Sequence, residues 1–147
     1  MRAEVPWEFV DTNVLVYAYD KTAGVKHQHA ASLMAGLWQS RRGCISIQVL
    51  QEFFTVGTRK LTWLHTSDLR TILRDLSAWR LHSPSASDVL DAAELHERMQ
   101  ISFWDAMILQ SATVLNCRTL WSEDLNAGQF YGSVRLLNPF QVKNPDP

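Results

Sequence analysis

The sequence predicts an α/β domain in which a mainly parallel central sheet carries helices on both faces. The chain has 147 residues, the size of one compact domain, and 46% of them are hydrophobic, enough for a buried core. Short apolar runs alternate along the chain with longer runs whose apolar residues recur every three or four positions. Strands that alternate with helices pair in parallel, because a helix carries the chain back across the sheet.

The first half of the chain supplies two of the predicted strands. These strands are expected at residues 9–11 and 44–47, and helices at 26–40, 48–58 and 67–76. Thr12 and Asn13, which follow the first strand, are good helix-start residues and predict an additional helix through the apolar run beyond them. The sequence RRG ends the helix at 26–40, and Ser46 is the expected N-cap of the next helix.

The second half is predicted to continue the same alternation. A loop is expected at residues 83–88, helices at 89–99 and 102–115, strands at 117–121 and 134–137, and a turn or short helix at 122–128. The helix at 102–115 is apolar nearly all round, which predicts a buried position. We expect a single domain over residues 1–143, followed by a short C-terminal tail at 144–147.

Composition narrows the class of protein. The net charge of -1 excludes a global basic field, so any binding of nucleic acid requires a local patch or a bound cation. The two cysteines, Cys44 and Cys117, do not form a disulfide framework and fit a reducing compartment. The sequence shows neither a signal peptide nor an apolar run of the roughly 20 residues that span a bilayer. We therefore expect a cytoplasmic protein that does not bind a membrane.

Four acidic residues follow strands or begin helices at one predicted edge of the sheet. Asp11 ends the first strand and Asp124 lies just past another, and the carboxyl ends of parallel strands share one edge. Glu52 lies in the first turns of the helix after the second strand, on the shoulder of its apolar face. Asp105 is in the first turn of its helix and points with the apolar residues, where the helix dipole favours a carboxylate by roughly 0.3–1 kcal/mol.

Each of these acids also has an ordinary structural interpretation. Asp11 can cap a helix, Asp105 can form a capping box with Ser102, Glu52 can be a solvated residue on the shoulder of its helix, and Asp124 can be a turn residue. A single shared site would instead explain all four positions at once. Converging carboxylates repel one another unless cations join them, and hard oxygen ligands favour Mg²⁺ or Mn²⁺. Such an ion activates water and stabilises charge on a scissile phosphate.

Four segments of the sequence, in order, resemble a known family. They are FVDTNVLVYAYD, QVLQEFF, SFWDAMILQSA and LWSEDLNAGQ, followed by an NPF ending, and together they extend over nearly the whole chain. In these motifs the chain resembles PIN-domain ribonucleases, most of all the VapC-like toxins of type II toxin–antitoxin pairs. The resemblance implies a PIN-domain-like α/β/α sandwich with a mainly parallel central sheet.

The resemblance also implies an activity and its residues. It implies a metal-dependent endoribonuclease that cleaves structured RNA, is blocked by a cognate antitoxin protein and forms a homodimer. The catalytic residues and ligands of one or two Mg²⁺ or Mn²⁺ ions would be Asp11, Glu52, Asp105 and Asp124. Asn13 and Ser122 match polar positions that support the acidic cluster.

Two basic pairs are candidates for contacts with RNA phosphates. Arg59 and Lys60 stand just beyond the helix that carries Glu52, and Arg41 and Arg42 follow the helix at 26–40. Ordinary surface charge is the alternative explanation of both pairs.

Two other functions remain open at the level of the sequence. Asp11 begins a D-x-D-like motif of aspartate-dependent phosphatases, but Asn13 replaces the second acid. A phosphatase would form a phosphoenzyme at Asp11, whereas a non-catalytic PIN-like binding module would bind metal without turnover. The H-x-H of His27 and His29 lacks the further ligands that a zinc site needs, so surface histidines are expected there.

Overall fold

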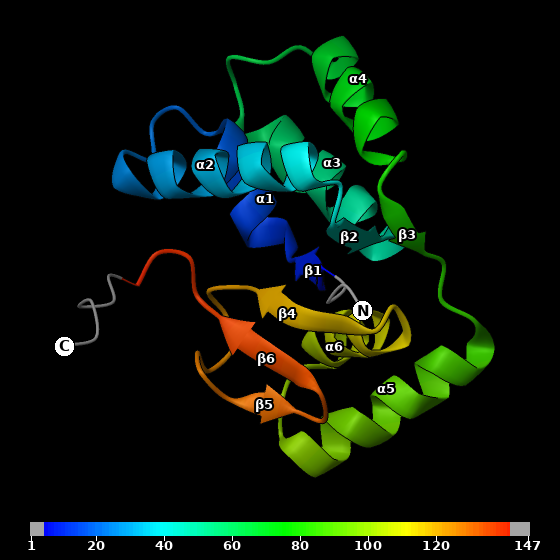
Figure 1. The fold of residues 1–147 in the computed structure, drawn as a ribbon. Coiled ribbons are helices and arrows are strands. Elements are labelled where there is room, and N and C mark those ends of the chain that lie inside the picture. The colour runs from blue at the N-terminus through cyan, green and yellow to red at the C-terminus, as the bar shows by residue number, and fades with distance from the viewer. Residues whose placement is uncertain (1–4, 142–147) are drawn as a thin grey trace, which may run out of the picture.

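A computed structural model describes residues 5–141, which form six helices and six strands (Figure 1). The strands are β1 (Trp7–Val10), β2 (Gly43–Ser46), β3 (Arg80–His82), β4 (Cys117–Trp121), β5 (Phe130–Tyr131) and β6 (Val134–Leu137). The helices are α1 (Thr12–Tyr19), α2 (Val25–Ser40), α3 (Ile47–Lys60), α4 (Thr66–Leu76), α5 (Ala86–Met99) and α6 (Phe103–Val114). The predicted boundary at residue 143 and the tail at 144–147 lie outside the described residues.

The six strands form one sheet in the order β3-β2-β1-β4-β6-β5. All neighbouring pairs are parallel except β5 and β6, which form an antiparallel hairpin at one edge. The predicted mainly parallel α/β sheet is therefore confirmed. All four residues of β2 are buried, as expected for a strand covered on both faces.

The order of the strands places a switch point between β1 and β4. From β1 the chain moves outward through β2 to β3, and it then returns to pair β4 with the other side of β1. Right-handed crossovers in opposite directions put their helices on opposite faces of a sheet. Figure 1 shows this arrangement, with α1 to α4 on one side of the sheet and α5 and α6 on the other. Ligands of open α/β sheets bind at such a switch point, beyond the carboxyl ends of the strands.

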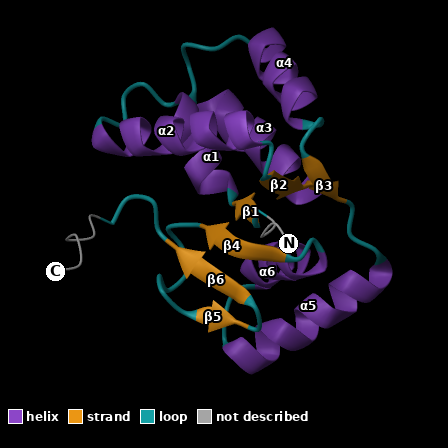
Figure 2. Cartoon of the chain, viewed as in Figure 1, coloured by secondary structure: helices purple, strands orange, loops and turns teal. Residues whose placement is uncertain are grey.

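Helix caps fix the chain at the ends of these strands. The Asp11 side chain caps α1, Ser46 caps α3 by accepting from the backbone N–H of Val49, and Ser102 caps α6. Because each cap follows a strand or a tight turn, the first turns of α1 and α3 start at the carboxyl edge of the sheet, as the secondary-structure colours of Figure 2 show. None of the helices between residues 5 and 141 is both long and apolar enough to cross a bilayer.

The structure differs from the predicted elements at three places. The strands β3 and β5 were not predicted, since runs of three and two residues are too short to show an alternating pattern. Helix α5 begins inside the predicted loop at 83–88, because Ser85 and Asp88 form a reciprocal capping box. Residues 122–128 make turns, which is one of the two predicted alternatives.

Candidate active site

A cavity of about 310 Å³ opens at the carboxyl edge of the sheet, beside the switch point between β1 and β4. Asp11, directly after β1, lines it together with residues of α1, α3, α6 and the segment after β4. Its acidic lining residues are Asp11, Asp20, Glu52, Asp105, Glu123 and Asp124. All four acids that the sequence singled out therefore line one cavity.

Asp11 is held at the base of this cavity by hydrogen bonds to both of its carboxylate oxygens. Its side chain is only 5% exposed. The backbone N–H of Thr12 donates to Oδ1 at 2.7 Å, and the Ser122 hydroxyl donates to Oδ2 at 2.7 Å. The Asp11 backbone N–H continues the ladder to the Trp121 carbonyl at 2.9 Å. These contacts fix both the position and the orientation of the carboxylate.

Asn13 and Ser122 connect Asp124 to Asp11. The Ser122 hydroxyl, besides donating to Asp11, accepts from the Asp124 backbone N–H at 3.1 Å. The Asn13 side-chain amide donates to Asp124 Oδ2 at 2.8 Å, and its Oδ1 accepts from the Glu123 backbone N–H at 3.5 Å. The two polar residues thus hold the segment after β4 against the start of α1, as expected of residues that support an acidic cluster.

Asp105 completes a group of three close carboxylates. The Ser102 hydroxyl caps the backbone N–H of Asp105 at 3.1 Å, which fixes the start of α6. One carboxylate oxygen from each of Asp11, Asp105 and Asp124 lies within 4.8 Å of the others. Among residues 5–141, no other group of three or more His, Cys, Asp or Glu side chains comes this close together.

Glu52 lines the same cavity but does not belong to this close group of three. Its Oε1 accepts a hydrogen bond of 2.6 Å from the Gln48 side chain, and the same Gln48 nitrogen donates to the Trp104 carbonyl at 3.2 Å. Gln48 therefore connects α3 to the start of α6. The helical periodicity of about 100° per residue predicts that Gln48 faces solvent. In the structure, Gln48 is buried, because the start of α6 lies against it.

The charges of the close acids repel one another. Burial raises the pKa of Asp11 from 3.8 to about 7; the hydrogen bonds from Ser122 and Thr12 oppose this rise, and the carboxylates of Asp124 and Asp105 add to it. Burial, followed by the charge of Asp124, also raises the pKa of Asp105. A bound cation would remove this cost, because it favours the ionised form of every carboxylate around it.

The residues present fit a hard divalent cation. The three close side chains offer only carboxylate oxygens, the ligands that Mg²⁺ and Mn²⁺ prefer. Two buried oxygens of cavity-lining residues, Thr12 Oγ1 and Gln48 Oε1, have no hydrogen-bond partner among the described residues. Additional acceptors of this kind can bind the water molecules that Mg²⁺ retains.

The structure separates the two basic pairs. Lys60 lines the cavity and Arg59 precedes it in the last turn of α3, both with exposed side chains. Arg41 and Arg42 instead precede β2 at its amino end, which is the opposite end of the sheet from the acids. The Arg42 guanidinium lies 4.5 Å from the ring centroid of Trp7. Arg41 and Arg42 therefore lie away from the acid-lined cavity, and their contact with RNA phosphates stays a prediction.

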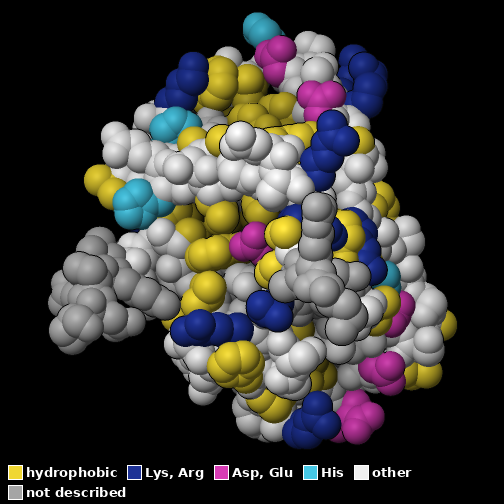
Figure 3. All heavy atoms as spheres, viewed as in Figure 1, with side chains coloured by type: hydrophobic (Ala, Val, Ile, Leu, Met, Phe, Trp, Pro, Cys, Tyr) yellow, Lys and Arg dark blue, Asp and Glu magenta, His cyan; other side chains and the backbone are white. Residues whose placement is uncertain are grey.

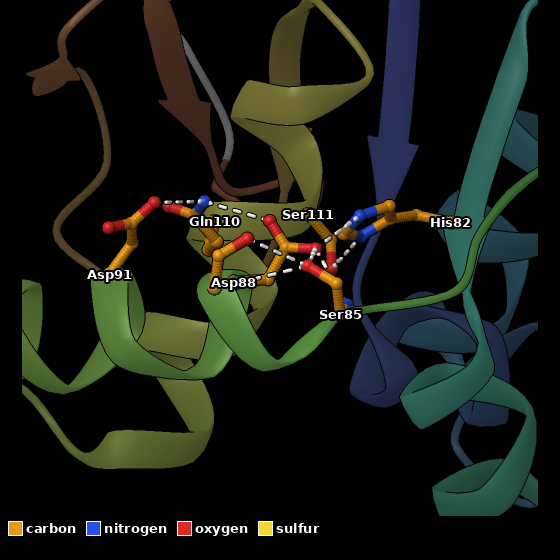
Figure 4. A network of polar contacts seen from close by, with 7 residues as sticks. His82, Ser85, Asp88, Asp91, Gln110 and Ser111 are labelled. Carbon is orange, nitrogen blue, oxygen red and sulfur yellow. Dashed lines mark hydrogen bonds and ion pairs between the residues drawn. The ribbon is translucent and has the colours of Figure 1, made fainter.

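A second polar network lies at the carboxyl end of β3 and contains a serine, a histidine and an aspartate (Figure 4). His82 Nδ1 is 2.8 Å from the Ser111 hydroxyl, and His82 Nε2 is 3.2 Å from Asp88 Oδ2. Ser111 is only 1% exposed, and neither Ser111 nor His82 lines the cavity of the acids. A nucleophile must reach its substrate, so this network joins β3, α5 and α6 rather than forming a hydrolase triad.

Comparison with known proteins identifies the family. A sequence model of the PIN domain matches residues 9–132, which include all four predicted acids. The chain belongs to the PIN-domain family. The predicted family resemblance is confirmed on this point, and the α/β/α arrangement of the sheet and helices is consistent with it. A search of curated protein sequences finds no significant match.

Solved structures of toxin–antitoxin proteins share this PIN-domain fold. A toxin–antitoxin complex from Klebsiella pneumoniae matches with a TM-score of 0.68 and 17% identity, covering 92% of this chain and 99% of that one. VapBC2 from Rickettsia felis, bound to a promoter DNA fragment, has a TM-score of 0.62 and 20% identity over 89% and 97% of the two chains. The sarcin-ricin loop cleaving toxin VapC20 from Mycobacterium tuberculosis has a TM-score of 0.58 and 19% identity over 77% and 86%.

Gln48 and Trp104 belong to the site but were not predicted as site residues from the sequence. Gln48 precedes Glu52 by four positions, a spacing that places two side chains together on a helix and is the signal that could have revealed their contact. Trp104 and Lys60 also line the cavity, and Trp104 stands directly before Asp105. Lys60 was predicted only as a phosphate contact near the site.

Proposed function

We propose that this PIN-domain protein is a metal-dependent endoribonuclease and the toxin component of a toxin–antitoxin pair. The observation that carries the proposal is the convergence of the Asp11, Asp105 and Asp124 carboxylates at the switch point of the sheet, beside an open cavity. Three carboxylates held this close repel one another, and a bound cation would remove that repulsion.

Each residue of the site has a role that follows from its contacts. Asp11, Asp105 and Asp124 would hold Mg²⁺ or Mn²⁺, which supplies activation of water and charge stabilisation on the phosphate. Ser122 and Asn13 keep Asp11 and Asp124 in place through their hydrogen bonds. Glu52, oriented by Gln48, lies outside the close group and is free to orient the attacking water or to hold a second ion.

The basic residues of the rim supply the contact with the RNA backbone. Lys60 lines the cavity, and Arg59 lies beside it at the end of α3. Both are exposed, so their charges can approach phosphates that flank the scissile bond. Because the chain as a whole has a net charge of -1, this local contact and the bound ion provide the attraction for RNA. Lys, Arg and acidic side chains are interspersed on the face shown in Figure 3.

The toxin assignment rests on the solved structures that share the fold. Several of them are complexes of a toxin with its antitoxin, and one toxin is described as cleaving the sarcin-ricin loop. By analogy we infer an antitoxin that covers the cavity, a homodimer and a cytoplasmic location for this chain.

The phosphatase alternative has less support in the geometry. A covalent mechanism needs the Asp11 carboxylate alone to reach phosphorus, but Asp11 is 5% exposed at the base of the cavity. Attack by water on a phosphate held by a cation agrees better with the convergence of Asp11, Asp105 and Asp124. A non-catalytic binding module would have the same cluster and is distinguished by turnover alone.

Cleavage of total cellular RNA by the purified protein tests the proposal. The reactions contain Mg²⁺ or Mn²⁺, or EDTA, and compare the wild type with Asp11→Asn. Asp75→Asn, an exposed acid on α4, is the matched control. Discrete fragments that require metal and vanish only with Asp11→Asn are expected. Intact RNA under every condition, together with metal binding, would establish a binding module instead.

A further inference from the structure

Trp104 stands at the rim of the acid-lined cavity with an unusual exposure for its size. The side chain is 64% exposed, the highest value among the six tryptophans of the chain, all of which the structure describes. It lines the cavity together with Lys60, Val56 and Ile108, and it directly precedes the carboxylate of Asp105. A large exposed aromatic surface beside a polar site is typical of a binding surface rather than of packing.

Both the backbone and the ring of Trp104 make fixed contacts. Its carbonyl accepts the hydrogen bond from Gln48 at 3.2 Å, so the residue is tied to the side chain that orients Glu52. Its ring meets the ring of Phe103 edge to face, with centroids 5.2 Å apart, and Phe103 packs on a small buried cluster of Ala92, Ala106 and Met107. The indole is therefore anchored while most of its surface faces solvent.

The other exposed tryptophans are engaged differently. Trp63 donates its indole N–H to the Tyr19 carbonyl at 3.0 Å, and the Lys21 ammonium lies 4.0 Å from its ring centroid. Trp38 packs against Trp79 with centroids 5.3 Å apart. Neither lines the cavity of the acids. Trp104 alone joins high exposure to a position next to the proposed ligands.

We infer that Trp104 is a nucleobase-binding subsite, on which one unpaired base of the RNA stacks beside the scissile phosphate. This inference rests on the proposed function, because that function places a phosphate at Asp105, the next residue along the chain. An RNA strand carries a planar aromatic base beside each phosphate, and aromatic side chains bind unpaired bases by stacking. A base inside a duplex is stacked on its neighbours and presents no free face, so the subsite selects single-stranded segments, loops or bulges.

The test measures binding of a fluorescently labelled short single-stranded RNA by anisotropy, in the Asp11→Asn background with Mg²⁺ so that the RNA stays intact. W104A, W104F and F130A are added to that background. Phe130 is the matched control, because it is an aromatic residue with the same 64% exposure that lines a different groove, between α5 and β5. Stacking of one base contributes a factor of roughly 5 to 150 in affinity.

We expect W104A to weaken binding by about fivefold or more, W104F to retain most of the affinity, and F130A to leave it unchanged. The same strand with its bases removed should bind equally well with and without Trp104, and so should the strand in a duplex. Because the side chain is exposed, the melting temperature of W104A should match that of its background. Equal affinity of the W104A protein and its background for single-stranded RNA would overturn the inference and leave Trp104 as a contact for a protein partner.

Failure of the inference and failure of the proposed function give different results. If the wild type cleaves RNA with metal while W104A does not alter binding, only the base subsite is wrong. If none of the proteins binds or cleaves RNA, the ribonuclease assignment fails and the subsite fails with it.

Discussion

Two polar clusters lie at the carboxyl edge of the same sheet, and they differ in the balance of their charges. At the switch point, Asp11, Asp105 and Asp124 place three carboxylates around an open cavity. At the end of β3, one ring nitrogen of His82 is hydrogen-bonded to the Ser111 hydroxyl and the other contacts the Asp88 carboxylate (Figure 4). The second cluster pairs its polar groups with one another, whereas the first leaves three carboxylates close together without a positively charged side chain among them.

This difference separates a functional cluster from a structural one more clearly than residue types do. Serine, histidine and aspartate are the residues of a hydrolase triad, yet Ser111 is buried and out of reach of a substrate. Three aspartates alone suggest helix caps and turns, yet they share a cavity in which burial, with a smaller contribution from neighbouring carboxylates, raises the pKa of Asp11 and Asp105. Uncompensated charge beside a cavity indicates binding, and compensated charge inside the fold indicates stability.

The largest expected effect is loss of activity on removing one charge from the carboxylate cluster. Asp11→Asn or Asp105→Asn should reduce RNA cleavage by at least about a hundredfold, since even residues that only orient metal ligands contribute 10- to 100-fold. Without metal, the melting temperature should hold or rise, because one repulsive charge is gone. Cleavage assays and thermal melts check this pair of results, and a large loss of stability in both variants would identify the acids as structural caps.

The pH dependence of the free energy of unfolding should report the cost of ionising the buried Asp11 in the metal-free protein. Asp11 has a pKa of about 7 when folded and an ordinary value of 3.8 when unfolded, so the folded state binds more protons between these values. The free energy of unfolding should therefore fall as pH rises from about 4 to 7, by on the order of a few kcal/mol. Denaturant unfolding in EDTA at several pH values measures it.

Asp11→Asn is the control for this pH dependence, because the amide does not titrate. The fall in stability should flatten in that variant. Saturating Mg²⁺ should oppose the fall in the wild type, so the rise in melting temperature caused by metal should be larger at pH 7 than at pH 5. An equally steep pH dependence in Asp11→Asn would assign the effect to another group.

Removing His82 should lower stability and leave cleavage unchanged, which is the reverse of removing a charge from the carboxylate cluster. His82→Ala removes one hydrogen-bond partner from the buried Ser111 hydroxyl and one ion-pair partner from the Asp88 carboxylate. This loss should lower the free energy of unfolding by roughly 1–3 kcal/mol. Cleavage by the protein that remains folded should be unchanged, since the network does not line the cavity. Denaturant unfolding and cleavage rates, measured below the melting temperature, decide this, and loss of turnover without loss of stability would make the network catalytic.

A smaller effect is expected from the residues that orient the acids. Ser122→Ala removes a hydrogen bond of 2.7 Å to Asp11 and the acceptor for the Asp124 backbone, and should reduce cleavage about tenfold. Raising the metal concentration should recover part of this loss, because the ligands themselves are present. Cleavage rates across a titration of Mg²⁺ test it, and a loss that metal does not relieve would point to disruption of the fold.

The sequence was sufficient for the main features of the fold and for the position of the acids. Asp11 and Asp124 were placed at one edge because each follows a strand, and parallel strands end on the same side. Ser46 and Ser102 were expected as caps, and they fix the starts of α3 and α6. These features depend on short sequence patterns and on the order of strands and helices along the chain, both of which can be read from a single sequence.

Other features depend on packing between distant segments. His82 contacts Ser111 across 29 positions, so nothing local marks His82 as buried. Gln48 looks exposed on its own helix, but α6 covers it. Arg41 and Arg42 were named as phosphate contacts by charge alone, and the length of β2 separates them from the edge that carries the acids. Glu52 was predicted among the ligands, and its distance from the three aspartates is a property of how α3 packs.

Direct measurement of Mn²⁺ binding tests the central claim, that the three aspartates form a cation site. Electron paramagnetic resonance follows the loss of the free Mn²⁺ signal as wild-type protein, Asp124→Asn and the control Asp75→Asn are titrated into the ion. We expect saturable binding by the wild type and the control, and a large loss of affinity with Asp124→Asn. Equal binding by all three proteins, or none by the wild type, would contradict the claim.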